Sequence, residues 1–185
     1  MTPTGVPVQD VRERLLDSAA RVLLRDGPSG VTSRAVTTAA GLAKGMLHRY
    51  FPDFDAFLAA FVASRLELLD ACSANLRASA GERTVADNLA GALAEALDPV
   101  NRATIALVGS RRALLERLRV ATPAGVPLAA EVTRMVAAYL TAERGLGRIA
   151  LEADVDRLAP ALVGAVLLSD HAADDTVALA QALGL

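Results

Sequence analysis

Aromatic residues are scarce in this sequence of 185 residues, and tryptophan is absent. Phenylalanine and tyrosine make up 3% of the chain, whereas hydrophobic residues as a whole make up 53%. Alanine and leucine dominate, and both favour helices, while β-sheets rely more on aromatic and β-branched residues. The composition therefore predicts an all-α protein, long enough to bury a core, and it excludes disorder as a general description.

Long apolar runs and cysteine pairs are missing as well. The longest apolar segment, Ala161 to Leu168, is well short of the roughly 20 residues that a membrane helix needs. The N-terminus lacks the apolar stretch behind a basic start that marks a secretory signal. The single cysteine, Cys72, cannot form an internal disulfide and fits a reducing compartment. We therefore expect a cytoplasmic protein with no membrane span.

Residues for catalysis or metal binding do not cluster in the sequence. His48 and His171 are the only histidines, and no His, Cys, Asp and Glu residues stand at metal-ligand spacing. The sequence has no nucleophile elbow, no phosphate-binding loop and no dinucleotide-binding glycine motif. Acidic pairs such as Asp154 and Asp156 fall at expected helix starts, where capping explains them. We therefore expect no enzyme, no cofactor and no metal.

The chain as a whole lacks a net positive charge, but its N-terminal part has one. The whole chain has a formal net charge of −2, whereas residues 1–52 carry seven basic and four acidic side chains, a net charge of +3. Between Gly27 and Pro52 there are three basic residues and no acidic residue. Any surface that faces phosphate groups is therefore expected within this stretch.

The stretch from Val31 to Phe57 predicts two short helices joined by a glycine turn. Thr32 has the hydroxyl that caps a helix N-terminus, and residues 33–40 follow with apolar residues on one face. Gly41 then supplies the positive φ that a sharp reversal between helices needs. The sequence therefore predicts a helix-turn-helix, with a first helix of about two turns.

The second helix is expected to start at about Lys44 and to end at Pro52. Its Leu47, Tyr50 and Phe51 have the i, i+3, i+4 spacing of an inward face. The outward face then carries Lys44, Gly45, Met46, His48 and Arg49. Because this face holds most of the charge of the segment, the second helix is the expected DNA reader.

The same residues resemble the TetR family of transcriptional repressors. The helix-turn-helix reads T-x-x-x-V-x-x-A-A-G-L-x-K-G-x-L-x-x-Y-F-P, and Arg12 to Gly27, which reads R-x-R-L-L-x-x-A-A-x-x-L-L-x-x-G, is similar to the first helix of that family. The resemblance covers about sixty residues. Three positions depart from it: Ala43 stands where the family usually has a serine cap, His48 where it has tyrosine, and Phe54 where it has lysine. The last two remove or weaken usual phosphate contacts.

The resemblance implies that the second helix lies in the DNA major groove. Lysine and arginine can donate hydrogen bonds to guanine or phosphate, and glycine permits close approach to base edges. The residues expected to contact DNA are Thr32, Ser33, Arg34, Lys44, Gly45, Met46, His48, Arg49 and Tyr50. The alternative is an ordinary helical hairpin with a solvated basic face.

Helical patterns separated by glycine and proline signals cover the rest of the chain. They predict helices at about residues 8–25, 54–78, 83–97, 100–108, 111–120, 127–144, 156–168 and 174–183. We expect residues 1–53 to form a DNA-binding domain, with its helix-turn-helix at about residues 32–51. Residues 54–185 are expected to form a helical domain for ligand binding and dimerisation.

The helices at about 127–144 and 156–168 are expected to form a two-fold dimer interface, as the resemblance also implies. A monomer reads too few base pairs to be specific, whereas a dimer doubles the half-sites at a fixed spacing. The expected interface residues are Val132, Val136, Leu158, Ala161, Leu162, Ala165 and Leu168. The alternative is that these helices only close the core of the monomer.

By the same resemblance, the middle helices enclose a pocket for a small-molecule effector. The expected lining is Leu66, Leu69, Cys72, Leu107, Leu114, Met135 and Tyr139, although a place in the core explains each of these equally well. With few polar residues on these faces, an apolar ligand is favoured over a charged one. The sequence thus predicts a homodimeric repressor that binds double-stranded DNA and is released by a ligand. A helical protein-binding adaptor without sequence-specific DNA binding is the alternative.

Overall fold

The computed structural model describes residues 8–119, 125–169 and 178, and the described residues form helices and connecting loops without a strand. The helices are α1 (Val8–Gly30), α2 (Ser33–Ala39), α3 (Met46–Tyr50), α4 (Phe54–Ala78), α5 (Val85–Ala96), α6 (Pro99–Ser110), α7 (Arg112–Arg119), α8 (Pro127–Gly145) and α9 (Val155–Leu168). This confirms the predicted all-α fold. Among the described helices, none has the length and apolar character to cross a membrane.

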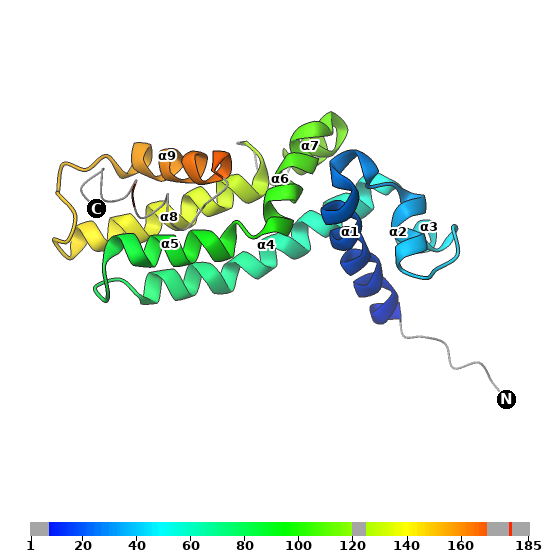
Figure 1. Cartoon of the computed structure of the whole chain (residues 1–185), viewed down its shortest axis with the longest axis horizontal. Helices are drawn as coiled ribbons and strands as arrows, with labels where there is room; N and C mark the ends of the chain where they lie inside the picture. The colour runs from blue at the N-terminus through cyan, green and yellow to red at the C-terminus, as the bar shows by residue number, and fades with distance from the viewer. Residues whose placement is uncertain (1–7, 120–124, 170–177, 179–185) are drawn as a thin grey trace.

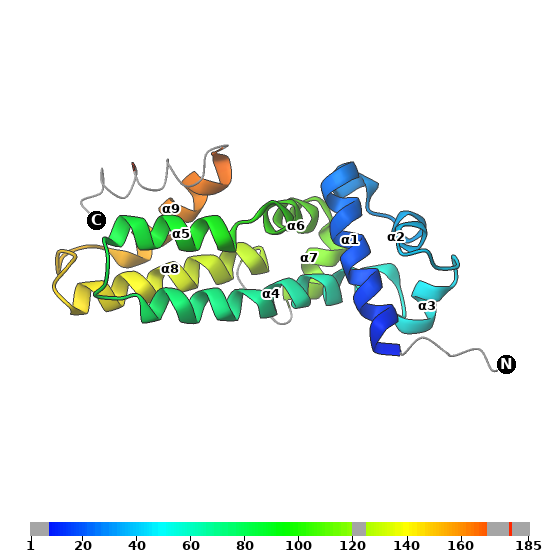
Figure 2. The same cartoon turned by 60° about the horizontal axis from the view of Figure 1, so that its bottom comes forward.

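The molecule is elongated, with a head of α1, α2 and α3 at one end and a body of α4 to α9 (Figure 1). Helix α4 starts beside the head and runs along the body next to α5 and α8, and α9 packs against α8. Helices α6 and α7 lie between the head and the long helices of the body (Figure 2). Helix α4, the longest described helix, is therefore part of both the head end and the body end of the molecule.

Short polar side chains fix the starts of five of the described helices, among them Thr32, the cap that the sequence predicts. The N-caps Thr32, Asp53, Thr84, Asp98 and Asp154 each accept a hydrogen bond from a backbone N–H three residues on, at 3.1, 2.6, 3.0, 2.7 and 3.2 Å. Each cap satisfies a backbone donor that has no partner within its helix. The predicted order of helices is confirmed through α9, and the predicted helix at 174–183 lies outside the described residues.

Several helix ends differ from the prediction by one or more residues, and three of them bear on the fold. Helix α3 starts at Met46, because Lys44 and Gly45 lie in a turn whose backbone is closed by a 2.9 Å hydrogen bond from the Met46 N–H to the Ala43 carbonyl. Helix α1 is interrupted at Gly27, where φ is 70°, and resumes for a further turn. Helix α9 starts one residue earlier than predicted, so that Pro160 lies inside it, beyond its first turn.

The hydrophobic core runs without a break from the head into the body. Helix α1 packs closely against α6, and α4 packs against α5, α7 and α8. On α4, Phe57 and Phe61 are buried near the head, while Leu69 and Leu76 are buried along the body. Apolar burial is the main favourable term in folding, so the head and the body stabilise each other through α4.

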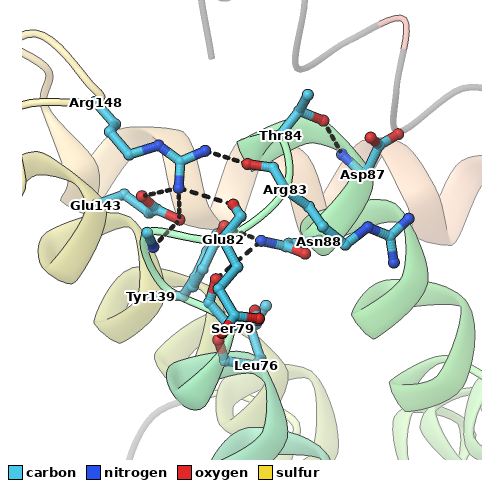
Figure 3. Close-up of polar contacts among 11 residues, drawn as sticks. Leu76, Ser79, Glu82, Arg83, Thr84, Asp87, Asn88, Tyr139, Glu143 and Arg148 are labelled. Atoms are coloured by element: carbon cyan, nitrogen blue, oxygen red, sulfur yellow. Dashed lines mark hydrogen bonds and ion pairs between the residues drawn. The ribbon is translucent and has the colours of Figure 1, made fainter.

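A polar cluster closes the end of the body that is farther from the head (Figure 3). Glu143 on α8 is fully buried; its Oε1 accepts a hydrogen bond from the Gly81 N–H at 3.3 Å, and its Oε2 lies 3.3 Å from Nη1 of Arg148. Arg148 also donates to the carbonyl groups of Glu82, at 2.8 Å, and Arg83. The loop between α4 and α5 is thereby tied to the C-terminal end of α8.

Tyr139 joins this cluster from inside the body. Its side chain is completely buried, and Asn88 Nδ2 donates to its hydroxyl oxygen at 2.9 Å and to the Ser79 carbonyl at 3.2 Å. Burial raises the pKa of Tyr139, and the neighbouring Glu143 carboxylate raises it further. The phenol therefore stays neutral at physiological pH and remains available as a hydrogen-bond donor.

We expect Arg148→Ala to lower the free energy of unfolding by about 2 to 3 kcal/mol, because it leaves the buried Glu143 carboxylate without its cation. Arg134→Ala on α8 removes the cation of an exposed pair with Glu131 and is expected to change stability by less than about 0.5 kcal/mol. Urea unfolding at one fixed protein concentration compares the two. Equal effects would show that the cluster contributes no more than a surface ion pair.

Candidate DNA-binding surface

Helix α2 is short, and its first turn is held by side chains. The Thr32 hydroxyl caps it, and the Thr37 hydroxyl donates to the Ser33 carbonyl at 2.9 Å. Val36 and Thr37 are buried against the head, while Thr32 and Arg34 are exposed and Ser33 is half-buried. The predicted phosphate-facing residues of α2 are therefore presented on its outer side.

The turn after α2 needs its glycine. Gly41 has a φ of 66°, its N–H donates to the Thr38 carbonyl at 3.0 Å, and the Leu42 N–H donates to the Thr37 carbonyl at 2.9 Å. This pair of bonds is the Schellman motif, in which a left-handed residue ends a helix. Arg14 of α1 adds a 2.8 Å bond to the Ala40 carbonyl. The reversal between α2 and α3 is thereby fixed to α1.

Apolar residues anchor α3 from one side. Leu47 is fully buried, and the buried Phe51 ring meets the Phe57 ring edge-on at a centroid distance of 5.1 Å. The guanidinium carbon of Arg12 lies 5.0 Å from the centroid of the Phe51 ring, a cation–π contact. These contacts fix which face of the short helix points outward.

The outward face of α3 and its preceding turn carries the residues predicted to read DNA. Lys44, Gly45, His48 and Arg49 are exposed, and Met46 is half-buried. Tyr50 is also half-buried, at the edge of this face. A Cβ atom added to Gly45 would meet no atom within 4 Å, and its φ of −82° is open to any residue. Neither packing nor a positive φ therefore requires glycine at this N-cap of α3.

Two residues that the sequence analysis did not name lie beside the predicted phosphate-facing residues of α2. Arg25 of α1 and Thr38 of α2 line an open groove together with Thr32 and Arg34. Thr38 stands four residues after Arg34, so helical spacing places both on one face, whereas nothing in the sequence pairs Arg25 with α2. Arg25 is bound to Asp26 at 2.7 Å, which offsets part of the positive charge at this groove.

Two arginines of the body reach the ends of the helix-turn-helix. Arg111, which follows α6, donates to the Val31 carbonyl at 2.6 Å, and Arg117 of α7 forms a 2.9 Å ion pair with Asp53. The Ala56 N–H and the Arg117 guanidinium hold the pKa of Asp53 below its usual range. The head is thus joined to the body by polar contacts as well as by the core.

Phe54 faces protein groups as well as solvent. It is half-buried, its ring stacks on that of Phe57 at a centroid distance of 5.7 Å, and the guanidinium carbon of Arg111 lies 5.5 Å from its centroid. The resemblance leads us to expect a lysine at this position. The structure instead has an aromatic ring there, in a cation–π contact with Arg111 of the body.

The structure does not bring the predicted ligand-pocket residues together around one described cavity. Leu107, Leu114, Met135 and Tyr139 are packed in the core with at most 1% of their surface exposed. Leu69 and Cys72 line one open groove with Asn101, and Leu66 lines another, between α4 and α8. Burial raises the pKa of Cys72 to about 11, and Glu95 adds to the shift, so its thiol is protonated.

The residues predicted to form the dimer interface divide into a buried group and a more exposed group. The prediction needs correction for the buried group. Val132, Val136 and Leu162 are fully buried within the chain, so they have no surface left to offer a second copy. Leu158 is half-buried, whereas Ala161, Ala165 and Leu168 are exposed on α9, the last with 92% of its surface accessible. Helical periodicity identified apolar faces correctly but could not tell a core face from an outer one.

Among the described residues, no group of three or more His, Cys, Asp or Glu side chains lies close enough together to hold a metal ion. The exposed polar groups of α2, α3 and the turn between them are instead hydrogen-bond donors: one lysine, two arginines, one histidine and hydroxyl groups. Such donors match phosphate oxygens and the acceptor edges of bases.

Comparisons with known proteins support this description. Residues 15–61 match the family described as bacterial regulatory proteins, tetR family. A search of curated proteins found no match. Among solved structures, the fold is similar to that of a TetR-family member from Streptomyces coelicolor A3, with 23% identity over 94% of this chain and 98% of the other and a TM-score of 0.65.

Two further structures share the fold over nearly the whole chain. The reduced form of NemR from E. coli has 18% identity over 94% of this chain and 97% of the other, with a TM-score of 0.71. The multidrug binding protein EbrR, solved with imidazole, has 21% identity over 96% of each chain and a TM-score of 0.61. Residues 15–61, which include the whole helix-turn-helix, therefore match the DNA-binding domain of the tetR family of bacterial regulatory proteins, and the described chain shares the fold of solved TetR-family structures.

Proposed function

We propose that this protein is a homodimeric repressor that a small, apolar ligand releases from its operator. The observation that carries the proposal is the outward face of α3 and its preceding turn, where Lys44 and Arg49 flank an unobstructed Gly45. Residues 1–53 serve as the DNA-binding part, and residues 54–185 bind the ligand and the second subunit. Because operator DNA lies in the cytoplasm of a bacterial cell, we place the protein there.

In this proposal α3 enters the major groove and the N-terminus of α2 contacts the phosphate backbone. Lys44, Arg49 and His48 donate to base edges or phosphates, and Thr32, Ser33 and Arg34 donate to phosphates. Met46 and Tyr50 complete the contact at the edges of the two helices. A surface of this size reads only a few base pairs, so specificity depends on a second head at a fixed spacing of about 34 Å.

The dimer interface of the proposal centres on the outer side of α9. Ala161, Ala165 and Leu168 lie at i, i+4 and i+7 and form one exposed stripe, beside the half-buried Leu158. Small residues let a second helix approach closely, and an exposed leucine gains from burial. The fully buried residues Val132, Val136 and Leu162 support this stripe from the core.

The ligand of the proposal enters the body between α4, α7 and α8. The buried residues Leu107, Leu114, Met135 and Tyr139, together with Leu66, Leu69 and Cys72, are then the apolar wall that parts to admit it. EbrR, which shares the fold, is a multidrug binding protein, which supports a ligand site in this body. The ligand favours a dimer whose two heads no longer match successive major grooves, so its affinity differs between the two states.

Arg49→Ala and Lys44→Ala are each expected to raise the Kd for a selected operator about tenfold and to lower the slope of log K against log salt by about 1. Fluorescence anisotropy at several salt concentrations measures both quantities. Arg77→Ala, at the far end of α4, removes the same charge away from the head and is the control. If all three variants weaken binding equally, the effect is one of net charge, and the proposed contacts are wrong.

Gly45→Gln is expected to raise the Kd by about tenfold, because the longer side chain holds α3 away from base edges. The fold has room for it, so the thermal midpoint should stay within a few degrees, as about 0.5 kcal/mol implies. Gly91→Gln on α5 also meets open space and should bind as the wild type does. Undiminished affinity in Gly45→Gln would place this turn outside the DNA contact.

Ala165→Glu is expected to shift the full-length protein from dimer to monomer, because it brings two carboxylates into an apolar two-fold contact. Ala74→Glu, an exposed position on α4, makes the same chemical change elsewhere on the body and should leave the dimer intact. Sedimentation equilibrium gives the mass of each variant. A dimer that survives Ala165→Glu unchanged would move the interface to another face.

A further inference from the structure

Arg111 occupies the corner between α6 and α7 and touches both ends of the helix-turn-helix. Its Nη2 donates to the Val31 carbonyl at 2.6 Å, and its guanidinium carbon lies 5.5 Å from the centroid of the Phe54 ring. Val31 directly precedes the cap of α2, and Phe54 is the first residue of α4 after α3. One side chain of the body therefore contacts the chain where it enters the motif and where it leaves it.

The contact uses properties that only a guanidinium combines. Its plane can lie over an aromatic ring while an N–H at its edge donates to a carbonyl, which a lysine ammonium cannot do at one place. Hydrogen bonds from a charged donor are roughly twice as strong as neutral ones. Arg111 is half-buried and Val31 is fully buried, so solvent screens this bond less than a surface pair.

Arg117, farther along α7, contacts the same region between the helix-turn-helix and the body. Its Nη2 lies 2.9 Å from Oδ2 of Asp53, whose other oxygen caps α4 through the Ala56 N–H at 2.6 Å. Both side chains of this pair are about half exposed, so it adds less than the Arg111 contact does. The two arginines come from the same corner of the body and meet the motif at residues 31, 53 and 54.

The packing of the head explains why such contacts matter. Helix α1 is fixed to α6 by apolar packing, but α2 and α3 contact the body less extensively and are short. Their orientation relative to the body therefore depends on the segments that flank them. In Figure 2, α6 and α7 lie next to the junction of α1 and α4, on the body side of the motif.

We propose that Arg111, supported by Arg117, is the positioning residue that fixes the orientation of α2 and α3 relative to the body. It thereby sets which spacing between two half-sites the dimer accepts. This role rests on the proposed homodimeric repressor, since spacing has meaning only for two linked heads. Without Arg111 the heads sample a wider range of orientations. The affinity for the best operator then falls, and the affinity lost when the spacing between half-sites is changed becomes smaller.

The test compares Arg111→Ala and Arg111→Lys with Arg112→Ala, all in the full-length protein. Arg112 is the neighbouring residue, with 92% of its side chain exposed, and among the described residues its ion-pair partner is Glu116, one turn on. Its variant therefore removes the same charge without a contact to the head. The probes are the duplex that the wild type selects from random sequences and copies of it with one base pair inserted or deleted between the half-sites. Fluorescence anisotropy gives the affinity ratio between the selected and the altered duplexes.

We expect this ratio to fall about fivefold or more in both Arg111 variants and to stay at the wild-type value in Arg112→Ala. A loss of folded protein would weaken binding to every duplex alike and leave the ratio unchanged, so the ratio separates positioning from stability. A wild-type ratio in Arg111→Ala would overturn the proposal.

Backbone hydrogen exchange provides a readout that needs no DNA. Amides of α2 and α3 should exchange faster in Arg111→Ala than in Arg112→Ala, while amides of α8 should exchange alike in both. Unchanged exchange in α2 and α3 would overturn the positioning role. If the wild type selects no duplex at all, the proposed operator binding fails, and the exchange comparison still decides whether Arg111 holds the motif.

Discussion

The shared helix α4 is the constraint on which the rest of the structure depends. Its first half supplies Phe57 and Phe61 to the head, and its second half supplies Leu69 and Leu76 to the body, all within one unbroken helix. A rigid helix of this length cannot serve two independent cores, so the head and the body share one. The packing of the head and the packing of the body are therefore joined by one continuous helix.

Arginine side chains secure the loops that the apolar core does not reach. Arg14 binds the Ala40 carbonyl, Arg111 the Val31 carbonyl, Arg144 the Ala153 carbonyl and Arg148 the Glu82 carbonyl. Carbonyl groups at helix ends and in loops otherwise lack partners, and a guanidinium can reach them from a distant element. In this chain with few aromatic residues, hydrogen bonds from arginine side chains thus fix several of the turns.

Local signals in the sequence predicted the helices well, because proline, glycine and capping residues act within one turn of their own position. The start of α3 was misplaced by two residues, since helical spacing extended through Gly45, which the fold uses as a cap. The apolar faces of Val132 and Leu162 were recognised, but their burial within one chain depends on how distant helices pack. The contact between Arg111 and Val31 joins residues far apart in the sequence, so no local pattern could reveal it.

The packing of α1 against α6 has a consequence for the order of events during synthesis. Helices α1, α2 and α3 leave the ribosome first, but the helix that covers α1 and the arginine that holds the Val31 carbonyl are made much later. The nascent head therefore lacks part of its final support until the α6–α7 corner has emerged. A growing chain therefore acquires the final support of its head only after α6 and Arg111 have been translated.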